Sequence, residues 1–206
     1  MALSLDEQVK EIKRSFRSSM NGVVAQSMRE KGVDYHLNWG VQLPRLDEMS
    51  KEYGKDEALA IALWKENVRE CKILAIMIMP SEKMKWDMAE LWMEQMPSQE
   101  MVEIAVQRLF QYMPDAPVYA FAWIARSAPL YQVGGYNLIA RLFAKGLEPN
   151  EMGINEYLDQ VGAALQEQNM QVKHAARNSV VRFCELGEEY AQIARKALGE
   201  EAVFGF

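Results

Sequence analysis

Residues 169–184 read NMQVKHAARNSVVRFC, and this stretch shows the pattern on which the fold prediction depends. At 3.6 residues per turn, one side of the predicted helix is formed by small and apolar side chains. These are Val172, Ala176, Ser179, Val180 and Phe183. The opposite side carries Lys173, His174, Arg177, Asn178 and Arg182. The stretch contains no Asp or Glu, although the net charge of the chain is −6. Such a helix is either a solvated cap on a core or the wall of an anion-binding surface.

Length and composition predict a globular protein. A chain of 206 residues, half of them apolar and a quarter charged, can bury one substantial core. Its longest apolar run, residues 73–80, is far shorter than the roughly 18 residues expected of a membrane span. The first residues lack the features of a secretory signal, and Cys71 and Cys184 match no metal-ligand spacing. We therefore expect a cytoplasmic monomer that binds neither membrane, metal nor cofactor.

Helical periodicity extends along nearly the whole chain, and strand signals are almost absent. We expect N-terminal helices over residues 5–18, 23–31 and 44–53, with a loop over residues 33–43. Helix pairs are expected over residues 56–66 and 68–79, 82–95 and 99–113, 117–126 and 130–145, and 154–166 and 170–184. A last helix is expected over residues 188–198.

The second helices of these pairs recur at a spacing typical of repeat proteins. They begin near residues 68, 99, 130 and 170, at intervals of about 31, 31 and 40 residues, as in two-helix repeats. The short turns are marked by Pro, which favours a stack of helix pairs over a four-helix bundle. The sequence predicts an all-α fold: a right-handed α-solenoid of HEAT-like helix pairs. It forms one domain over residues 1–206, with N-terminal helices in 1–54 and paired helices in 56–198.

Charges are sorted between the predicted helices of the C-terminal half. The second helices at 130–145 and 170–184 contain bases and no acids, whereas residues 151–168 contain four acids and no base. In a right-handed stack the second helices line the concave side. We therefore predict a basic concave surface that contacts an anionic partner. The predicted DNA-binding residues are Arg141, Lys145, Lys173, His174, Arg177 and Arg182.

Three segments resemble the bacterial DNA alkylation repair family, whose HEAT-like members include alkylpurine DNA glycosylases. They are GVQLPRLDEM (40–49), LWKENVRECKILAIMIM (63–79) and FAWIARSAPLYQVGGYNLI (121–139). The resemblance covers most of the chain after about residue 38. It rests on helix-packing residues such as Leu63, Trp64, Arg69 and Glu70, so it speaks to the fold more than to an activity.

The resemblance implies a basic cleft that holds duplex DNA around a cationic alkylated base. In active members an Asp stabilises the positive sugar–base system, tryptophans pack against the lesion, and an Arg holds phosphate. The Trp-x-x-x-Asp motif of the family falls here on Gln99 and Glu103. The family's Arg falls on Val133, and a further Trp falls near Asn178. Glu103 is therefore the candidate catalytic carboxylate, whereas the other three functional side chains are replaced.

Other motifs have two interpretations each. Trp86 and Trp92 are either core residues or a platform that stacks on the lesion, and the base-stacking candidates are Trp86 and Trp123. Gly134 and Gly135 lie inside a predicted helix, where they indicate close approach of either another helix or a phosphate backbone. The 14 methionines either fill the core or form an adaptable peptide-binding groove.

These observations lead to one main functional hypothesis and one alternative. The first is a DNA-binding protein of the DNA alkylation repair type, with duplex DNA as partner and excision of alkylated bases as a further step. The alternative is a non-enzymatic scaffold that binds another protein through a Met-rich groove.

Overall fold

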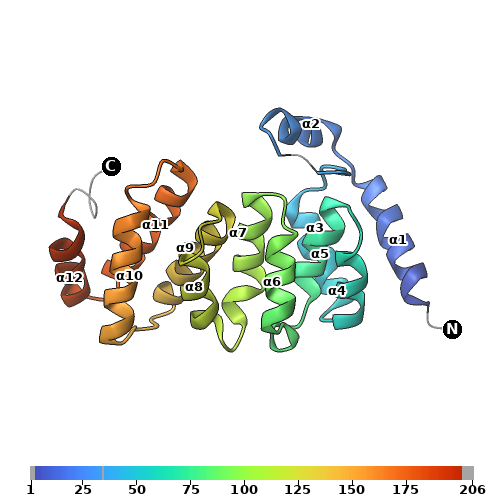
Figure 1. The fold of residues 1–206 in the computed structure, drawn as a ribbon. Coiled ribbons are helices and arrows are strands. Elements are labelled where there is room, and N and C mark those ends of the chain that lie inside the picture. The colour runs from blue at the N-terminus through green and yellow to red at the C-terminus, as the bar shows by residue number, and fades with distance from the viewer. Residues whose placement is uncertain (1–2, 34, 201–206) are drawn as a thin grey trace. The chain divides into compact units, whose positions relative to one another are not determined.

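A computed structural model describes residues 3–33 and 35–200, and across these ranges it contains helices and no strand (Figure 1). The predicted all-α fold is confirmed. An isolated bridge between Leu37 and Val68 anchors the predicted loop, of which residue 34 lies outside the described residues. The chain forms two compact units, Met1–Met113 and Pro114–Phe206, called here the N-terminal and C-terminal units. A single domain over residues 1–206 stays a prediction.

The N-terminal unit is built around α5 (Arg69–Ile78), which is buried along its whole length and packs against α3, α4 and α7. Helix α1 packs in turn against α4. The other elements of this unit are α1 (Leu5–Ser18), α2 (Gly22–Glu30), α3 (Leu43–Tyr53), α4 (Glu57–Trp64), η1 (Ser81–Lys83), α6 (Trp86–Glu94), α7 (Gln99–Arg108) and η2 (Phe110–Tyr112).

Local sequence explains where helices of this unit begin. The hydroxyl of Ser4 accepts a hydrogen bond from the Glu7 amide, and the Glu7 carboxylate accepts one from the Ser4 amide. This capping box satisfies two groups at the start of α1 that would otherwise lack partners. Asp56 and Ser98 cap α4 and α7 in the same way through one side-chain acceptor each.

Aromatic packing joins α4 to α6. The rings of Trp64 and Trp92 are stacked, with centroids 4.0 Å apart and planes only 5° from parallel. The indole N–H of Trp64 donates to Gln95 at 2.7 Å, and the ammonium of Lys72 lies 4.2 Å from the Trp64 ring centroid. The stack therefore buries two large side chains while the polar N–H still has a partner.

In the C-terminal unit, α9 is the central element and packs against both α8 and α11. The helices of this unit are α8 (Ala116–Ile124), α9 (Pro129–Ala144), α10 (Glu151–Ala164), α11 (Met170–Cys184) and α12 (Glu188–Leu198). Helix α10 packs against α11 and α12, and Figure 1 shows it in front of α11. Consecutive antiparallel helices thus form the pairs that the repeat spacing predicts.

A cluster of aromatic rings fills the core between α9, α10, α11 and α12. Phe143, Tyr157, Phe183 and Tyr190 contact one another with centroid separations of 5.3–5.4 Å. The buried hydroxyl of Tyr157 lies 2.7 Å from that of Ser179, which itself donates to the Ala176 carbonyl. Ser179 lies on the buried side of α11, as the sequence predicts, because its hydroxyl satisfies a core tyrosine.

Gly135 lets α9 approach the backbone of α8. A Cβ atom at this position would lie 2.7 Å from the Ile124 nitrogen and 2.9 Å from the Ala120 carbonyl oxygen. The close approach indicated by the glycine is therefore contact between two helices. The alternative, a phosphate backbone against this position, is wrong because α8 occupies the space.

Two predicted helix starts are wrong. The helix expected at 82–95 is divided into η1 and α6, because Met84 is extended and buried between them. The helix expected at 154–166 begins three residues earlier, at Glu151, because the Asn150 side chain accepts a hydrogen bond from the Gly153 amide. Pro149 and Gly153 are residue types common in loops, but an Asn at the N-cap position determines where the helix starts more strongly.

Candidate nucleic-acid interface

Helix α11 exposes most of the basic residues predicted from its sequence. Its N-cap Asn169 accepts hydrogen bonds from the amides of Gln171 and Val172. One side of the helix is buried against α9, and His174 and Arg177 are exposed on the other, with Lys173 half-buried at its edge. The amphipathic pattern therefore predicted which residues of α11 reach the solvent.

Helix α9 adds two cations at its C-terminal end. Arg141 is exposed in the last turn, and Lys145 is the exposed C-cap residue. Desolvation lowers the pKa of Lys145, and the nearby charge of Arg141 lowers it further. These two side chains therefore concentrate positive charge at one end of α9, a helix in direct contact with α11.

Arg182 differs from its neighbours because a carboxylate neutralises it. Its guanidinium lies 2.7 Å and 3.0 Å from the two carboxylate oxygens of Glu185, the C-cap residue of α11. In contrast, Arg141, Lys173 and Arg177 form no ion pair with any acid in residues 3–33 or 35–200. We call Arg141, Lys173, His174 and Arg177 the basic surface. Arg182 contributes little net charge to it.

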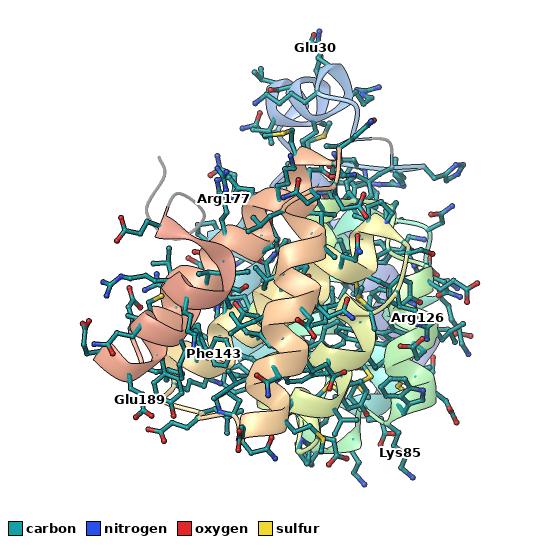
Figure 2. All side chains as sticks on the ribbon, turned by 60° about the vertical axis from the view of Figure 1, so that its left-hand side comes forward. Glu30, Lys85, Arg126, Phe143, Arg177 and Glu189 are labelled. Carbon is teal, nitrogen blue, oxygen red and sulfur yellow. The ribbon has the colours of Figure 1, made fainter. Side chains whose placement is uncertain are left out.

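Acids of this unit are concentrated on α10. Glu151, Glu156 and Asp159 are exposed there, and α10 contains no Lys or Arg. Bases lie on α11 and at the end of α9, so the charge sorting predicted from the sequence is present between neighbouring helices. In Figure 2, Arg177 on α11 and Arg126, which follows α8, are labelled on opposite sides of the view. The acids and the bases of this unit therefore lie on different helices.

The two predicted base-stacking residues have different environments. Trp86, the first residue of α6, is 36% exposed. Trp123 is fully buried, and Tyr119 and Tyr131 pack edge-on against it at 5.8 Å and 6.4 Å. No face of Trp123 is open to a base. The structure thus corrects the expectation for Trp123, which is a core residue.

Glu103, the candidate catalytic carboxylate, lies in an ordinary exposed position. It is in the second turn of α7 and accepts a hydrogen bond from Gln99 at 2.7 Å. Glu100 lies in the first turn of the same helix, and its carboxylate is instead held by Arg69 and Tyr35. A catalytic role for Glu103 remains a prediction that needs a functional assay.

The sequence analysis missed a charged network inside the N-terminal unit. The buried Arg69 guanidinium donates to both carboxylate oxygens of Glu100, at 2.6 Å and 3.1 Å. The Tyr35 hydroxyl donates to Glu100 at 2.9 Å and lies 2.7 Å from the Ser98 hydroxyl. Although desolvation favours the neutral acid, the hydrogen bonds from Arg69 and Tyr35 lower the pKa of Glu100 below its ordinary value.

Glu70 fixes the loop that precedes α3. Its buried carboxylate accepts hydrogen bonds from the amides of Trp39 and Val41, while the Arg69 guanidinium donates to the Val41 carbonyl. The Arg69 amide donates to the Leu37 carbonyl. The Arg-Glu pair of the family-like motif therefore holds a loop. The sequence feature that could have indicated this network is the charged pair Arg69 and Glu70, at the start of an otherwise apolar helix.

The methionines fill the core of the N-terminal unit. Six of the central ones are almost completely inaccessible to solvent: Met77, Met79, Met84, Met93, Met96 and Met101. Side chains without exposed surface cannot line a groove. The alternative of a Met-rich peptide-binding groove is therefore wrong for these residues.

Within residues 3–33 and 35–200, no three His, Cys, Asp or Glu residues are arranged to hold a metal ion. No helix in this part of the chain is both long and apolar enough to span a bilayer.

Comparison with known proteins shows the family of the chain. Residues 12–198 match the family described as DNA alkylation repair enzyme. The chain belongs to this family. A search of curated proteins finds no match.

A solved structure supports the same fold. It is described as "A new family of proteins related to the HEAT-like repeat DNA glycosylases with affinity for branched DNA structures". It superposes with a TM-score of 0.77 at 16% identity, covering 92% of this chain and 83% of that chain. At this identity the likeness concerns the arrangement of helices, and it confirms the HEAT-like fold.

Proposed function

We propose that this member of the DNA alkylation repair family binds duplex DNA, with the basic surface of α9 and α11 in contact with the phosphates. The observation that supports this most is the absence of ion pairing at Arg141, Lys173 and Arg177 within the described residues. The helices that carry these cations, α9 and α11, pack against each other and contain no Asp or Glu of their own that could neutralise them. Unpaired cations on two packed helices are the arrangement that phosphate binding requires.

Binding of this kind is driven mainly by the release of counterions from DNA. Each phosphate neutralised by Lys or Arg contributes a salt-dependent term that does not depend on base sequence. We therefore expect affinity to depend on DNA shape and charge more than on sequence.

The direct test compares the protein with the variant Lys173→Gln and Arg177→Gln. Fluorescence anisotropy with a labelled duplex, at about 50 mM salt, should show at least tenfold weaker binding for the variant. Lys83→Gln with Lys85→Gln is the matched control, because it removes two exposed cations next to α6. Equal losses in both variants, or no loss in the first, would remove the basic surface as the contact site.

Branched DNA is a second substrate to be measured. The similar solved structure belongs to proteins described as having affinity for branched DNA. A four-way junction presents several phosphate backbones at once to a surface that reads shape. We expect the junction to bind at least as tightly as a duplex of the same length, and the same two substitutions should weaken both.

Excision of alkylated bases is the more specific part of the proposed function. Release of a base from an N-alkylated duplex can be followed by chromatography of the free base. Glu103 is the carboxylate at the family position, so Glu103→Gln should abolish any release while leaving DNA affinity unchanged. Equal release by the variant would show that Glu103 has no catalytic role.

A further inference from the structure

A small apolar cavity opens between α8, α9 and the beginning of α10. Its volume is about 260 Å³, and its walls include Phe121, Leu142, Phe143, Leu147, Pro149 and Gly153. Phe143 is labelled in Figure 2. Pockets for drug-sized ligands typically measure about 300–1,000 Å³, so this cavity suits one bulky apolar side chain.

Exposed apolar residues occur on the same helices and loop that form this cavity. Leu147, in its wall, is 42% exposed. Val118 follows the lining residue Pro117 on α8, and Met152 precedes the lining residue Gly153 on α10; both side chains are largely exposed. Single exposed apolar residues are common, but three on the segments that form one cavity, with Leu147 in its wall, indicate a contact surface.

The first turns of α10 place carboxylates beside the cavity. Glu151, Met152, Glu156 and Asp159 line a shallow hollow of about 600 Å³ that begins one residue from the cavity wall. Among the described residues, none of these three acids forms an ion pair with a base. Their uncompensated negative charge repels a phosphate backbone and attracts a cationic partner.

We propose that this surface, called here the α8–α10 surface, binds a basic amphipathic segment of a partner protein. One bulky apolar side chain of the segment enters the cavity, and flanking Lys or Arg residues pair with Glu151, Glu156 and Asp159. The combination of an apolar cavity and unpaired acids selects this occupant, because a neutral apolar ligand leaves the acids without partners. The proposal does not depend on DNA binding.

The probe is a labelled peptide, Lys-Lys-Leu-Phe-Lys-Lys-Leu, titrated into the full chain and followed by amide chemical shifts. We expect shifts concentrated in residues 117–121 and 147–159. A peptide with Glu in place of each Lys, and one with Ala in place of Leu and Phe, should each bind at least about tenfold more weakly. Equal binding by either control peptide, or shifts elsewhere in the chain, would overturn the proposal.

Two protein variants separate the parts of the site. Glu156→Lys with Asp159→Lys should weaken binding of the basic peptide at least about tenfold. Leu147→Asp should also weaken binding, because it places a charge in the wall of the cavity. Glu30→Lys with Glu94→Lys changes charge equally at two exposed positions outside this surface and should not weaken it. If both double variants behave alike, binding is non-specific. A dimer seen by sedimentation and dissociated by Leu147→Asp would show a second copy of the chain on this surface, and it would also contradict the proposal.

Discussion

The Arg69 guanidinium lies 2.6 Å from the Glu100 carboxylate, and this ion pair joins α5 to α7 inside the N-terminal unit. The arginine side chain is only 2% exposed. A buried charge is stable only with partners, and Arg69 also donates to the Val41 carbonyl while its neighbour Glu70 holds two loop amides. The pair thus connects two helices and the loop before α3.

Arg69→Met should strongly destabilise the N-terminal unit. The substitution leaves Glu70 and Glu100 without their cation, and breaking a buried pair on one side costs about 3–5 kcal/mol. The free energy of unfolding, measured by urea denaturation, reports this loss. Arg45→Met is the control, because the exposed ion pairs of Arg45 with Glu48 and Glu52 contribute about 0–1 kcal/mol. Similar losses in both variants would contradict the network.

The Glu100 carboxylate should make stability depend on pH in the acid range. Its pKa in the folded protein is below the ordinary 4.5, so the unfolded chain takes up the proton first as pH falls. Its contribution is therefore complete well above pH 4.5 and decreases as pH falls towards the folded pKa. Glu100→Gln should lose stability at neutral pH and show a smaller acid-induced decrease. The reference is Glu103→Gln, which removes an exposed carboxylate from the same helix and should leave the stability at neutral pH unchanged.

Two helical glycines should respond in opposite directions to alanine. Gly135→Ala places a methyl group against the backbone of α8 and should destabilise the protein by about 1–3 kcal/mol. Gly162→Ala, on α10, meets only the Leu198 side chain at an ordinary 3.8 Å and should stabilise by about 0.4–1 kcal/mol. Thermal unfolding of both variants tests the comparison. A stable Gly135→Ala protein would show that α8 and α9 are farther apart.

The two thiols should differ in reactivity. Burial raises the pKa of Cys71 to about 12, and it also raises the pKa of the half-buried Cys184. Thiolate is the reactive form, so both should react slowly with a thiol reagent, and Cys184 should react first. Mass spectrometry after timed labelling identifies the modified residue, with urea-unfolded protein as the control. Faster labelling of Cys71 would contradict its buried position in α5.

Amphipathic periodicity predicted the helices with the clearest buried face. The bounds of α11 agree with the prediction at both ends, because Asn169 is a strong N-cap and the apolar residues recur regularly. Helix α10 begins earlier than its apolar periodicity indicates, because the Asn150 side chain caps it at Glu151. The division between η1 and α6 was missed because burial of Met84 is a tertiary effect that periodicity does not contain.

The sequence predicted those parts of the candidate site that depend on a single helix. Exposure of His174 and Arg177 follows from the pattern of α11 alone. Neutralisation of Arg182 was missed because its partner, Glu185, lies one residue beyond the stretch first considered. The Arg69–Glu100 pair was missed for a different reason, since contacts between helices distant in sequence are not visible in local spacing.

The salt dependence of duplex DNA binding tests the central claim most directly. The slope of log K against log salt decreases by about 0.9 for each phosphate contact removed. We predict that Arg141→Gln, Lys173→Gln and Arg177→Gln together reduce the slope by about 2–3 relative to the unmodified protein. The Lys83→Gln and Lys85→Gln control should keep the original slope. A triple variant with an unchanged slope would show that the basic surface does not contact DNA.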